Sequence, residues 1–260
     1  MKVLVFGDSC QDVHVYGKSE RLCPDAPVPV LVSIEKQSAD GMAGNVVKNL
    51  ESLGCECTFI SQEETIIKTR YVDKGTNHMF VRVDNEPKVT RIQDIKKYQE
   101  EANISDAIII SDYNKGFLTE KDIVDITCLN KSIPTFLDTK KPLGVWAQYV
   151  DFIKINQFEY EASRLFLEKH HDVFEEKLII TKDNKGADYM GQNFPVIDVP
   201  IKDKSGAGDT FLAGFVFFFV KNMYSSISSA IKFANLCATQ VIQKKGVCIV
   251  DPNTIEGYND

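Results

Sequence analysis

A short run of glycines followed by a carboxylate opens the most apolar stretch of the sequence. The run Gly206-Ala207-Gly208-Asp209 precedes residues 211–220, whose composition favours a buried helix. Glycines at a helix start allow backbone N–H groups to bind an anion, and the helix dipole adds positive potential there. Such a turn suits a transferring phosphoryl group, and Asp209 could take the proton of an attacking hydroxyl. A plain helix N-cap explains the residues alone equally well.

Composition and missing motifs exclude several other classes of protein. No Gly-x-x-x-x-Gly-Lys-Ser/Thr run and no early Gly-x-Gly-x-x-Gly fingerprint is present. The formal charge of −7 includes no basic block, so nucleic acid is not an expected partner. The apolar residues 211–220 are too few to span a membrane. Seven irregularly spaced cysteines give no zinc-binding set and favour reduced thiols, hence a cytoplasmic protein.

The elements that must position this turn follow from an alternation of apolar and amphipathic segments. We expect buried strands at residues 3–6, 107–110, 135–137, 152–155 and 178–181. Helical patterns lie at residues 43–53, 119–129, 157–168 and 206–221. The alternation predicts an α/β fold with a mainly parallel sheet, in a single domain spanning residues 1–260.

Three extended segments break the alternation. They lie at residues 27–34, 66–72 and 79–83, and a hairpin-like connection joins the last two. A small β lid drawn from about residues 13–35 and 65–90 would account for them and could shield a ligand from water. Ordinary edge strands of the main sheet are an equally good interpretation.

The motifs resemble those of one family, the ribokinase-like (PfkB) sugar kinases. Residues 203–209, Asp-Lys-Ser-Gly-Ala-Gly-Asp, are similar to its Asp-x-Thr-Gly-Ala-Gly-Asp signature. Residues 41–45, Gly-Met-Ala-Gly-Asn, resemble its Gly-Gly-x-x-Asn sugar motif, and residues 156–159, Asn-Gln-Phe-Glu, its Asn-x-x-Glu motif. The resemblance implies a three-layer α/β/α sandwich with a β lid. It also implies ATP and Mg²⁺ as co-substrates and allows a monovalent cation.

The same resemblance implies roles for individual residues. Asp209 would be the general base, and the turn residues Gly206, Ala207 and Gly208 would form an anion hole. Asn156 and Glu159 would help to place phosphate and Mg²⁺, the metal through water. Further positions match the nucleotide-binding stretches: Thr181, Lys182, Gly186 and Asn235. Others match positions that bind sugar hydroxyls: Asp8, Asp12, Gly41 and Asn45.

Within the family, the sequence is most similar to the subgroup that phosphorylates D-glycero-D-manno-heptose 7-phosphate at C1, a precursor of ADP- or GDP-heptose. Residues 21–30, Arg-Leu-Cys-Pro-Asp-Ala-Pro-Val-Pro-Val, and 111–116, Ser-Asp-Tyr-Asn-Lys-Gly, carry this similarity. A sugar phosphate needs cations around its phosphate. The substrate-binding candidates on this side are Lys68, Arg70, Arg82, Asp112 and Lys115. Taken singly, these are also ordinary exposed strand residues. A homodimer through the lid is a further implication.

The sequence departs from the family pattern at several points. Met42 replaces the second glycine of the sugar motif and could narrow the pocket or pack behind it. Members of the family carry a helix–strand unit where this sequence has only residues 61–64. We expect the loss of this unit to affect the choice of substrate more than the chemistry of the reaction. No nucleotidyltransferase region follows Asp260, so we expect kinase activity alone. The alternatives are a kinase for another sugar or nucleoside, and a catalytically weak sugar- or nucleotide-binding regulator.

Overall fold

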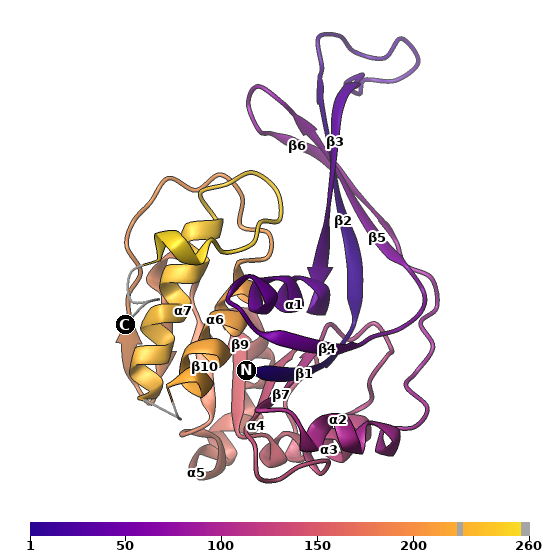
Figure 1. The fold of residues 1–260 in the computed structure, drawn as a ribbon. Helices are drawn as coiled ribbons and strands as arrows, with labels where there is room; N and C mark the ends of the chain where they lie inside the picture. The colour runs from indigo at the N-terminus through magenta and orange to yellow at the C-terminus, as the bar shows by residue number, and fades with distance from the viewer. Residues whose placement is uncertain (223–225, 256–260) are drawn as a thin grey trace.

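A computed structural model describes residues 1–222 and 226–255, and within them an eight-stranded sheet forms the centre of the fold (Figure 1). Its order is β12-β11-β10-β9-β8-β7-β1-β4. The parallel strands are β1 (Lys2–Gly7), β4 (Glu56–Ile60), β7 (Ala107–Asp112), β8 (Thr135–Thr139), β9 (Phe152–Asn156) and β10 (Leu178–Thr181). The short strands β11 (Ala187–Tyr189) and β12 (Gln192–Phe194) are antiparallel. All five strands expected from the sequence are confirmed.

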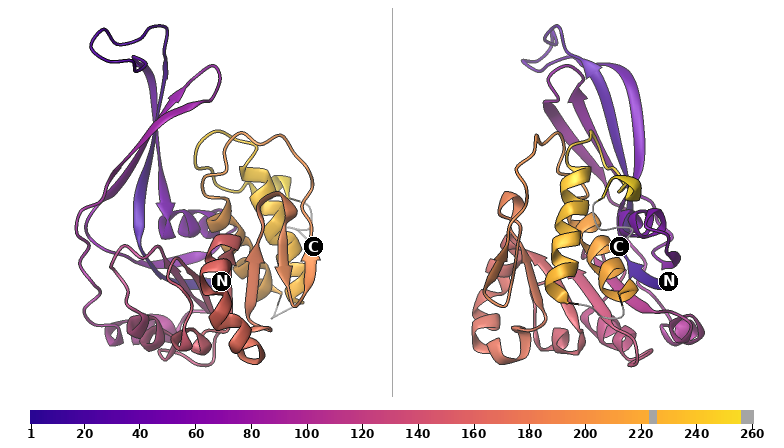
Figure 2. Two further views of the ribbon diagram at one scale, coloured as in Figure 1. Left: turned by 180° about the vertical axis from the view of Figure 1, so that it is seen from behind. Right: turned by 60° about the vertical axis from the view of Figure 1, so that its left-hand side comes forward.

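Helices cover both faces of this sheet, because alternate side chains of each strand point to opposite layers. In β1, Val3 and Val5 pack with α1 (Ala43–Ser52), α6 (Ala207–Lys221) and α7 (Ile227–Val241). Leu4 and Phe6 face the opposite layer, which is formed by α2 (Gln99–Asn103), α3 (Glu120–Thr127), α4 (Gln157–Lys169) and α5 (His171–Phe174). Figure 2 shows the two layers from further sides. The expected α/β/α sandwich is confirmed.

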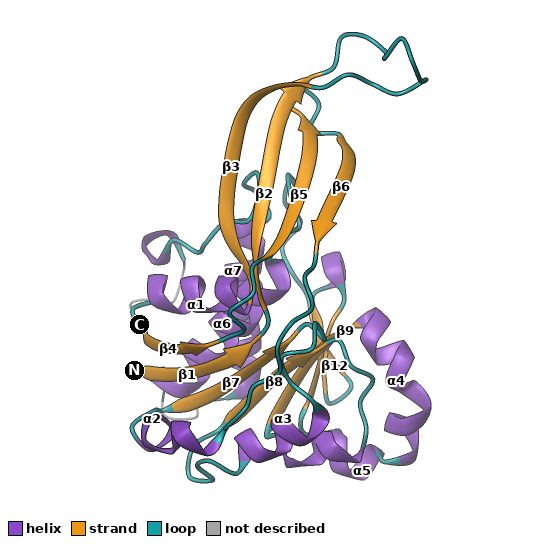
Figure 3. Cartoon of the chain, turned by 90° about the vertical axis from the view of Figure 1, so that its right-hand side faces the viewer, coloured by secondary structure: helices purple, strands orange, loops and turns teal. Residues whose placement is uncertain are grey.

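A second, four-stranded sheet projects from this body and forms the lid (Figure 3). Its order is β3 (Val32–Met42), β2 (Ser9–Lys18), β5 (Ile66–Asp73) and β6 (Met79–Asn85). These strands have a sheet of their own, so the edge-strand interpretation is wrong. The expected strand at residues 27–34 is also wrong in its bounds. Residues 27–31 lie outside β3, where Pro27 and Pro29 offer no backbone N–H to a ladder.

The trimmed stretch at residues 61–64 joins the body directly to the lid. β4 ends at Ile60, β5 begins at Ile66, and β4 is the last strand at its edge within the described part of the chain. Gln62 fixes this short connection, because its Nε2 donates to Ser9 O at 2.7 Å and its Oε1 accepts from Ser9 N at 3.0 Å. The two chain segments that lead from the body into β2 and β5 of the lid are therefore joined by hydrogen bonds.

Short 3₁₀ helices complete the described chain and lie at Lys96–Tyr98, Val145–Tyr149, Asp183–Lys185 and Pro252–Thr254. The carboxyl ends of the parallel strands lie toward the base of the lid (Figure 3). In a parallel α/β sheet, ligands bind at these ends.

Candidate functional site

The glycine turn lies at the N-terminus of α6 and requires glycine at two positions. Gly206 has φ +82°, and a Cβ atom there would lie 2.5 Å from Asn45 Nδ2. A Cβ atom on Gly208 would lie 2.9 Å from Lys154 Nζ. Because no side chain covers these positions, Asn45 and Lys154 can approach the turn backbone from either side.

Asp209 is 3% exposed and both of its carboxylate oxygens are hydrogen-bonded. Tyr113 Oη donates to Oδ1 at 2.5 Å, and Asn45 Nδ2 donates to Oδ2 at 3.1 Å. Burial raises the pKa of Asp209 to about 6, and the hydrogen bond from Tyr113 opposes this rise. The group is therefore ionised at neutral pH and still basic enough to accept a proton.

Two lysines that the sequence analysis did not select lie beside the turn, one buried and one partly buried. Lys154, 4% exposed, pairs with Asp138 Oδ2 at 2.6 Å. Lys140 pairs with Glu159 and lies 3.7 Å from Asp138 Oδ1. Burial alone would lower the pKa of Lys140, but Asp138 and Glu159 raise it, so this lysine stays charged. A lysine in the middle of a buried strand, Phe-Ile-Lys-Ile-Asn, was the signal for Lys154.

A cavity of about 480 Å³ opens in front of the turn. Ala207, Gly208, Lys140 and Lys154 line one part of it. Four of the residues expected to bind nucleotide line it as well: Asn156, Thr181, Gly186 and Asn235. Another part is apolar: Val196, Ile197, Val199, Ile201, Phe211, Ala238 and Ile242. A pocket with a cationic and an apolar part suits a phosphorylated compound that carries a flat base.

Lys182 is placed differently from the other nucleotide candidates. It pairs with Asp188 and is not among the residues that line the cavity. Asn235 lines the cavity, and its Nδ2 donates to Phe194 O at 2.9 Å, so its amide is fixed by the fold.

Asn156 and Glu159 form a capping box at the start of α4. Asn156 Oδ1 accepts from Glu159 N at 3.0 Å, and Glu159 Oε2 accepts from Asn156 N at 2.8 Å. The Glu159 carboxylate also holds Lys140. Across residues 1–222 and 226–255 no group of three or more His, Cys, Asp and Glu could hold a metal ion. Both oxygens of Glu159 already have partners, so its contact with Mg²⁺ through water stays a prediction.

Asp8 and Asp112 are completely buried, and their expected contact with the substrate stays a prediction. The backbone N–H groups of Tyr113, Lys115 and Phe117 point at the Asp8 carboxylate. Burial, together with neighbouring Asp112, raises the pKa of Asp8. Lys141 Nζ lies 2.7 Å from both oxygens of Asp112. The two carboxylates thus fix the loop after β7, which carries Tyr113.

The sugar motif lies where β3 meets α1. Gly41 leaves room for the Asp12 carboxylate, which pairs with Arg70 of the lid. Met42 has φ +57°, a backbone conformation that favours glycine. Its side chain is buried with Cys10 and Ile66, so it packs behind the motif.

The lid brings most of the expected phosphate-binding cations onto one face. Lys68 is the register partner of Asp12, and Arg70 on the same face lies opposite Arg82. Arg82 bonds Asp84 through two nitrogens, and Lys115 pairs with Glu86 at 2.5 Å. An incoming phosphate would have to exchange with these carboxylates.

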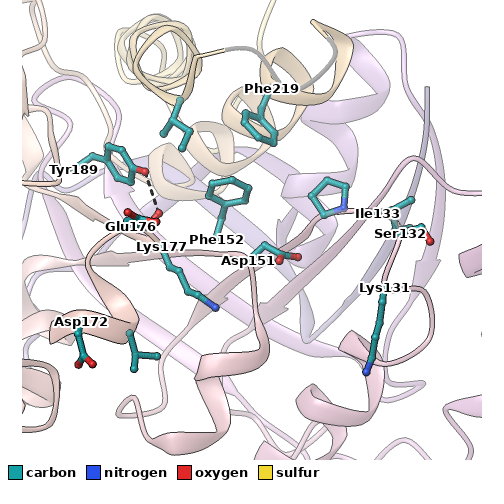
Figure 4. Close-up of a pocket in the computed structure, with 13 residues that line it drawn as sticks. Lys131, Ser132, Ile133, Asp151, Phe152, Asp172, Glu176, Lys177, Tyr189 and Phe219 are labelled. Atoms are coloured by element: carbon teal, nitrogen blue, oxygen red, sulfur yellow. Dashed lines mark hydrogen bonds between the residues drawn. The ribbon is translucent and has the colours of Figure 1, made fainter. Parts of the chain in front are cut away.

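A groove of about 520 Å³ lies elsewhere, near the amino ends of β8 and β9 (Figure 4). Its polar groups have structural partners. Lys177 Nζ donates to the carbonyls of Gln148 and Val150, and Asp151 accepts from Thr135. None of the residues that line this groove belongs to the glycine turn at the start of α6.

No helix in the described ranges is long and apolar enough to cross a membrane. The three-layer sheet with its lid and the glycine turn at a helix start define an α/β protein of the ribokinase-like fold. More particularly, the chain belongs to the pfkB family of carbohydrate kinases, whose family model matches residues 62–254. The expectation of a carbohydrate kinase family is confirmed.

Curated relatives and solved structures agree with this assignment. The "Bifunctional protein HldE" of Nitratiruptor sp. is 27% identical over 99% of this chain, and that of Helicobacter pylori strain G27 is 32% identical over 94%. The chain spans about 64% and 63% of the length of these two relatives. A ribokinase from Thermotoga maritima has TM-score 0.70 at 18% identity, covering 99% of this chain and 98% of its own. Phosphofructokinase-2 from Escherichia coli has TM-score 0.71 at 11% identity, covering 98% of both chains.

Proposed function

We propose that this protein is an ATP-dependent sugar kinase that transfers the γ-phosphoryl group to a hydroxyl of a sugar phosphate. One observation carries the proposal. A hydrogen-bonded carboxylate, Asp209, directly follows a glycine turn that opens on a cavity lined by Lys140 and Lys154. Such an arrangement would supply a base, an anion-binding turn and fixed positive charge within one site.

The proposed reaction needs positioning and charge neutralisation more than covalent chemistry. The adenine of ATP would lie in the apolar part of the cavity, and its phosphates would lie beside Lys140 and Lys154. Backbone N–H groups at the start of α6 would bind the γ-phosphoryl oxygens. The acceptor oxygen would bond to phosphorus as the bond to the β-phosphate oxygen breaks, and Asp209 would take the acceptor proton. Mg²⁺, when bound, would neutralise phosphate charge.

The proposed acceptor is C1 of D-glycero-D-manno-heptose 7-phosphate. Three features support a phosphorylated sugar: the cationic lid face with Lys68, Arg70 and Arg82, the subgroup-like residues 21–30 and 111–116, and the relatives named HldE. Because Lys68 lies on the Asp12 face of the lid, its ammonium is directed to the side on which a bound sugar would lie. Kinases for unphosphorylated sugars or nucleosides need no such cluster.

The proposed partner is a second copy of this chain, bound through the lid. Apolar side chains on the outer face are half exposed, namely Ile34, Val81 and Val83. A β-rich surface of this kind is stabilised by burial against another protein. The expected monovalent cation has no assigned residues and stays a prediction.

The proposed function is tested by measuring ATP consumption with a panel of sugars and sugar phosphates. We expect turnover with heptose 7-phosphate, much less with the unphosphorylated heptose, and loss of turnover in Asp209→Asn. Lys68→Met should raise KM for the sugar phosphate by about tenfold with little change in kcat. Lys36→Met is the matched control, since Lys36 is exposed and pairs with Val15 on the opposite face.

Two outcomes would contradict this assignment. Equal changes of KM in the Lys68 and Lys36 variants would contradict a phosphate-binding role for the lid face that carries Lys68. Binding of sugar or nucleotide without turnover, unaltered in Asp209→Asn, would favour the regulator.

A further inference from the structure

Tyr113 connects the catalytic carboxylate to both sides of the candidate site. Its hydroxyl donates to Asp209 Oδ1 at 2.5 Å, and its side chain lines the nucleotide cavity. Lys68 of the lid lies 5.5 Å from its ring centroid and Lys140 of the body lies 5.1 Å away. Ammonium groups at these distances are attracted to an aromatic ring. The ring therefore lies close to both the sugar-side lysine and the phosphate-side lysine.

The backbone of Tyr113 is as firmly held as its ring. Its N–H donates to the buried Asp8 carboxylate at 2.8 Å. Asn114, the next residue, has φ +56° and donates its N–H to Asp112 Oδ1 at 3.1 Å. Two buried carboxylates thus fix the turn that aims the phenol at Asp209. A hydroxyl held in this way keeps its direction when a substrate enters.

We propose that Tyr113 is a positioning residue for the general base: its hydroxyl orients the Asp209 carboxylate and keeps it ionised for proton transfer from the acceptor alcohol. The inference deepens the proposed function and rests on it. With Tyr113 on Oδ1 and Asn45 on Oδ2, the carboxylate cannot rotate freely. The remaining lone pairs of its oxygens would accept the proton of the acceptor hydroxyl once the substrate is bound.

The charges around Asp209 make the hydrogen bond from the Tyr113 hydroxyl important for keeping this carboxylate ionised. Burial and the carboxylate of Asp138 disfavour the ionised form, whereas Lys154 favours it. Lys140 also interacts with Asp209. Cys10 faces the group as well, but burial raises its pKa to about 12, so the thiol is neutral. Burial and Asp209 raise the pKa of Tyr113, which therefore remains a donor across the assay range.

The variant Tyr113→Phe tests the proposal because it removes one oxygen and keeps the ring near both lysines. We expect the acidic limb of the kcat profile to move up by about one pH unit. The loss of kcat should be about tenfold at pH 5 and about fivefold at pH 6, and it should shrink as pH rises toward 9. Tyr149→Phe, at an exposed position, is the matched control and should leave the profile unchanged.

A second readout does not require turnover. NMR titration of ¹³C-labelled aspartate carboxyls should show the Asp209 resonance titrating about one unit higher in Tyr113→Phe than in the unaltered protein. The Asp209→Asn spectrum identifies this resonance by its absence. An unshifted titration, or a loss of kcat of equal size at every pH, would overturn the role of Tyr113. Absence of kinase activity with the shift present would overturn the proposed function alone.

Discussion

Variants of Lys154 can distinguish a structural role of this residue from a catalytic role. The variant Lys154→Met keeps the length of the side chain and removes its charge. Lys154 and Asp138 are both almost completely buried, and their charged atoms lie 2.6 Å apart. The variant therefore leaves a carboxylate in the protein interior without its nearest counter-ion.

The expected size of the effect follows from this burial. Removing one partner of a buried ion pair costs about 3–5 kcal/mol of stability. Because Lys140 remains 3.7 Å from Asp138 Oδ1, we expect the free energy of unfolding to fall by about 3 kcal/mol, at the lower end. Loss of a fixed positive charge beside the transferring phosphoryl group should lower kcat by about 10²-fold.

The double variant Asp138→Asn/Lys154→Met separates the two effects. It removes both charges, so urea unfolding should show recovery to within about 1–2 kcal/mol of the unaltered protein. Turnover should stay low, because no lysine returns to the cavity. If the double variant recovers turnover along with stability, Lys154 acts only through the fold and its proposed contact with phosphate is wrong.

Two further predictions concern the turn itself. Burial raises the pKa of Asp209 to about 6, and the base must be ionised, so kcat should fall below pH 6 with unit slope and reach about one tenth of its maximum at pH 5. A flat profile from pH 5 to 7 would contradict this prediction. Circular dichroism at each pH would check that the protein stays folded. Gly206→Ala should destabilise the protein by about 1–2 kcal/mol and lower kcat by about 10²-fold, since its Cβ would push Asn45 away from Asp209. Gly191→Ala is the control: its φ of +72° is similar and nothing lies within 4 Å, so its stability should fall without a change in kcat.

Much of the body could be predicted from the sequence, because buried parallel strands are nearly continuous apolar runs. Residues 178–181 were expected as a strand and form β10 with those bounds. The lid was harder to predict. β2 reads Ser-Cys-Gln-Asp-Val-His-Val-Tyr-Gly-Lys, and its polar Asp12 and His14 are buried. Polar residues that face a site disrupt the alternation from which strands are recognised.

The site was only partly visible in the sequence for a related reason. The turn and Asp209 are consecutive residues, so their type and order carry the signal. Tyr113 and Lys140 directly follow β7 and β8, whereas Lys154 lies within β9, and only the register of the sheet brings them together. For Asp8 and Asp112, residue type predicted polar contacts but could not show that the partners are backbone N–H groups and Lys141.

The most direct test of the account is transfer of labelled γ-phosphate from ATP to heptose 7-phosphate by the unaltered protein and by Asp209→Asn under single-turnover conditions. The account predicts a rate at least about 10²-fold lower in the variant, with nucleotide affinity unchanged within about twofold. Equal rates for the two proteins would contradict the assignment of Asp209 as the base.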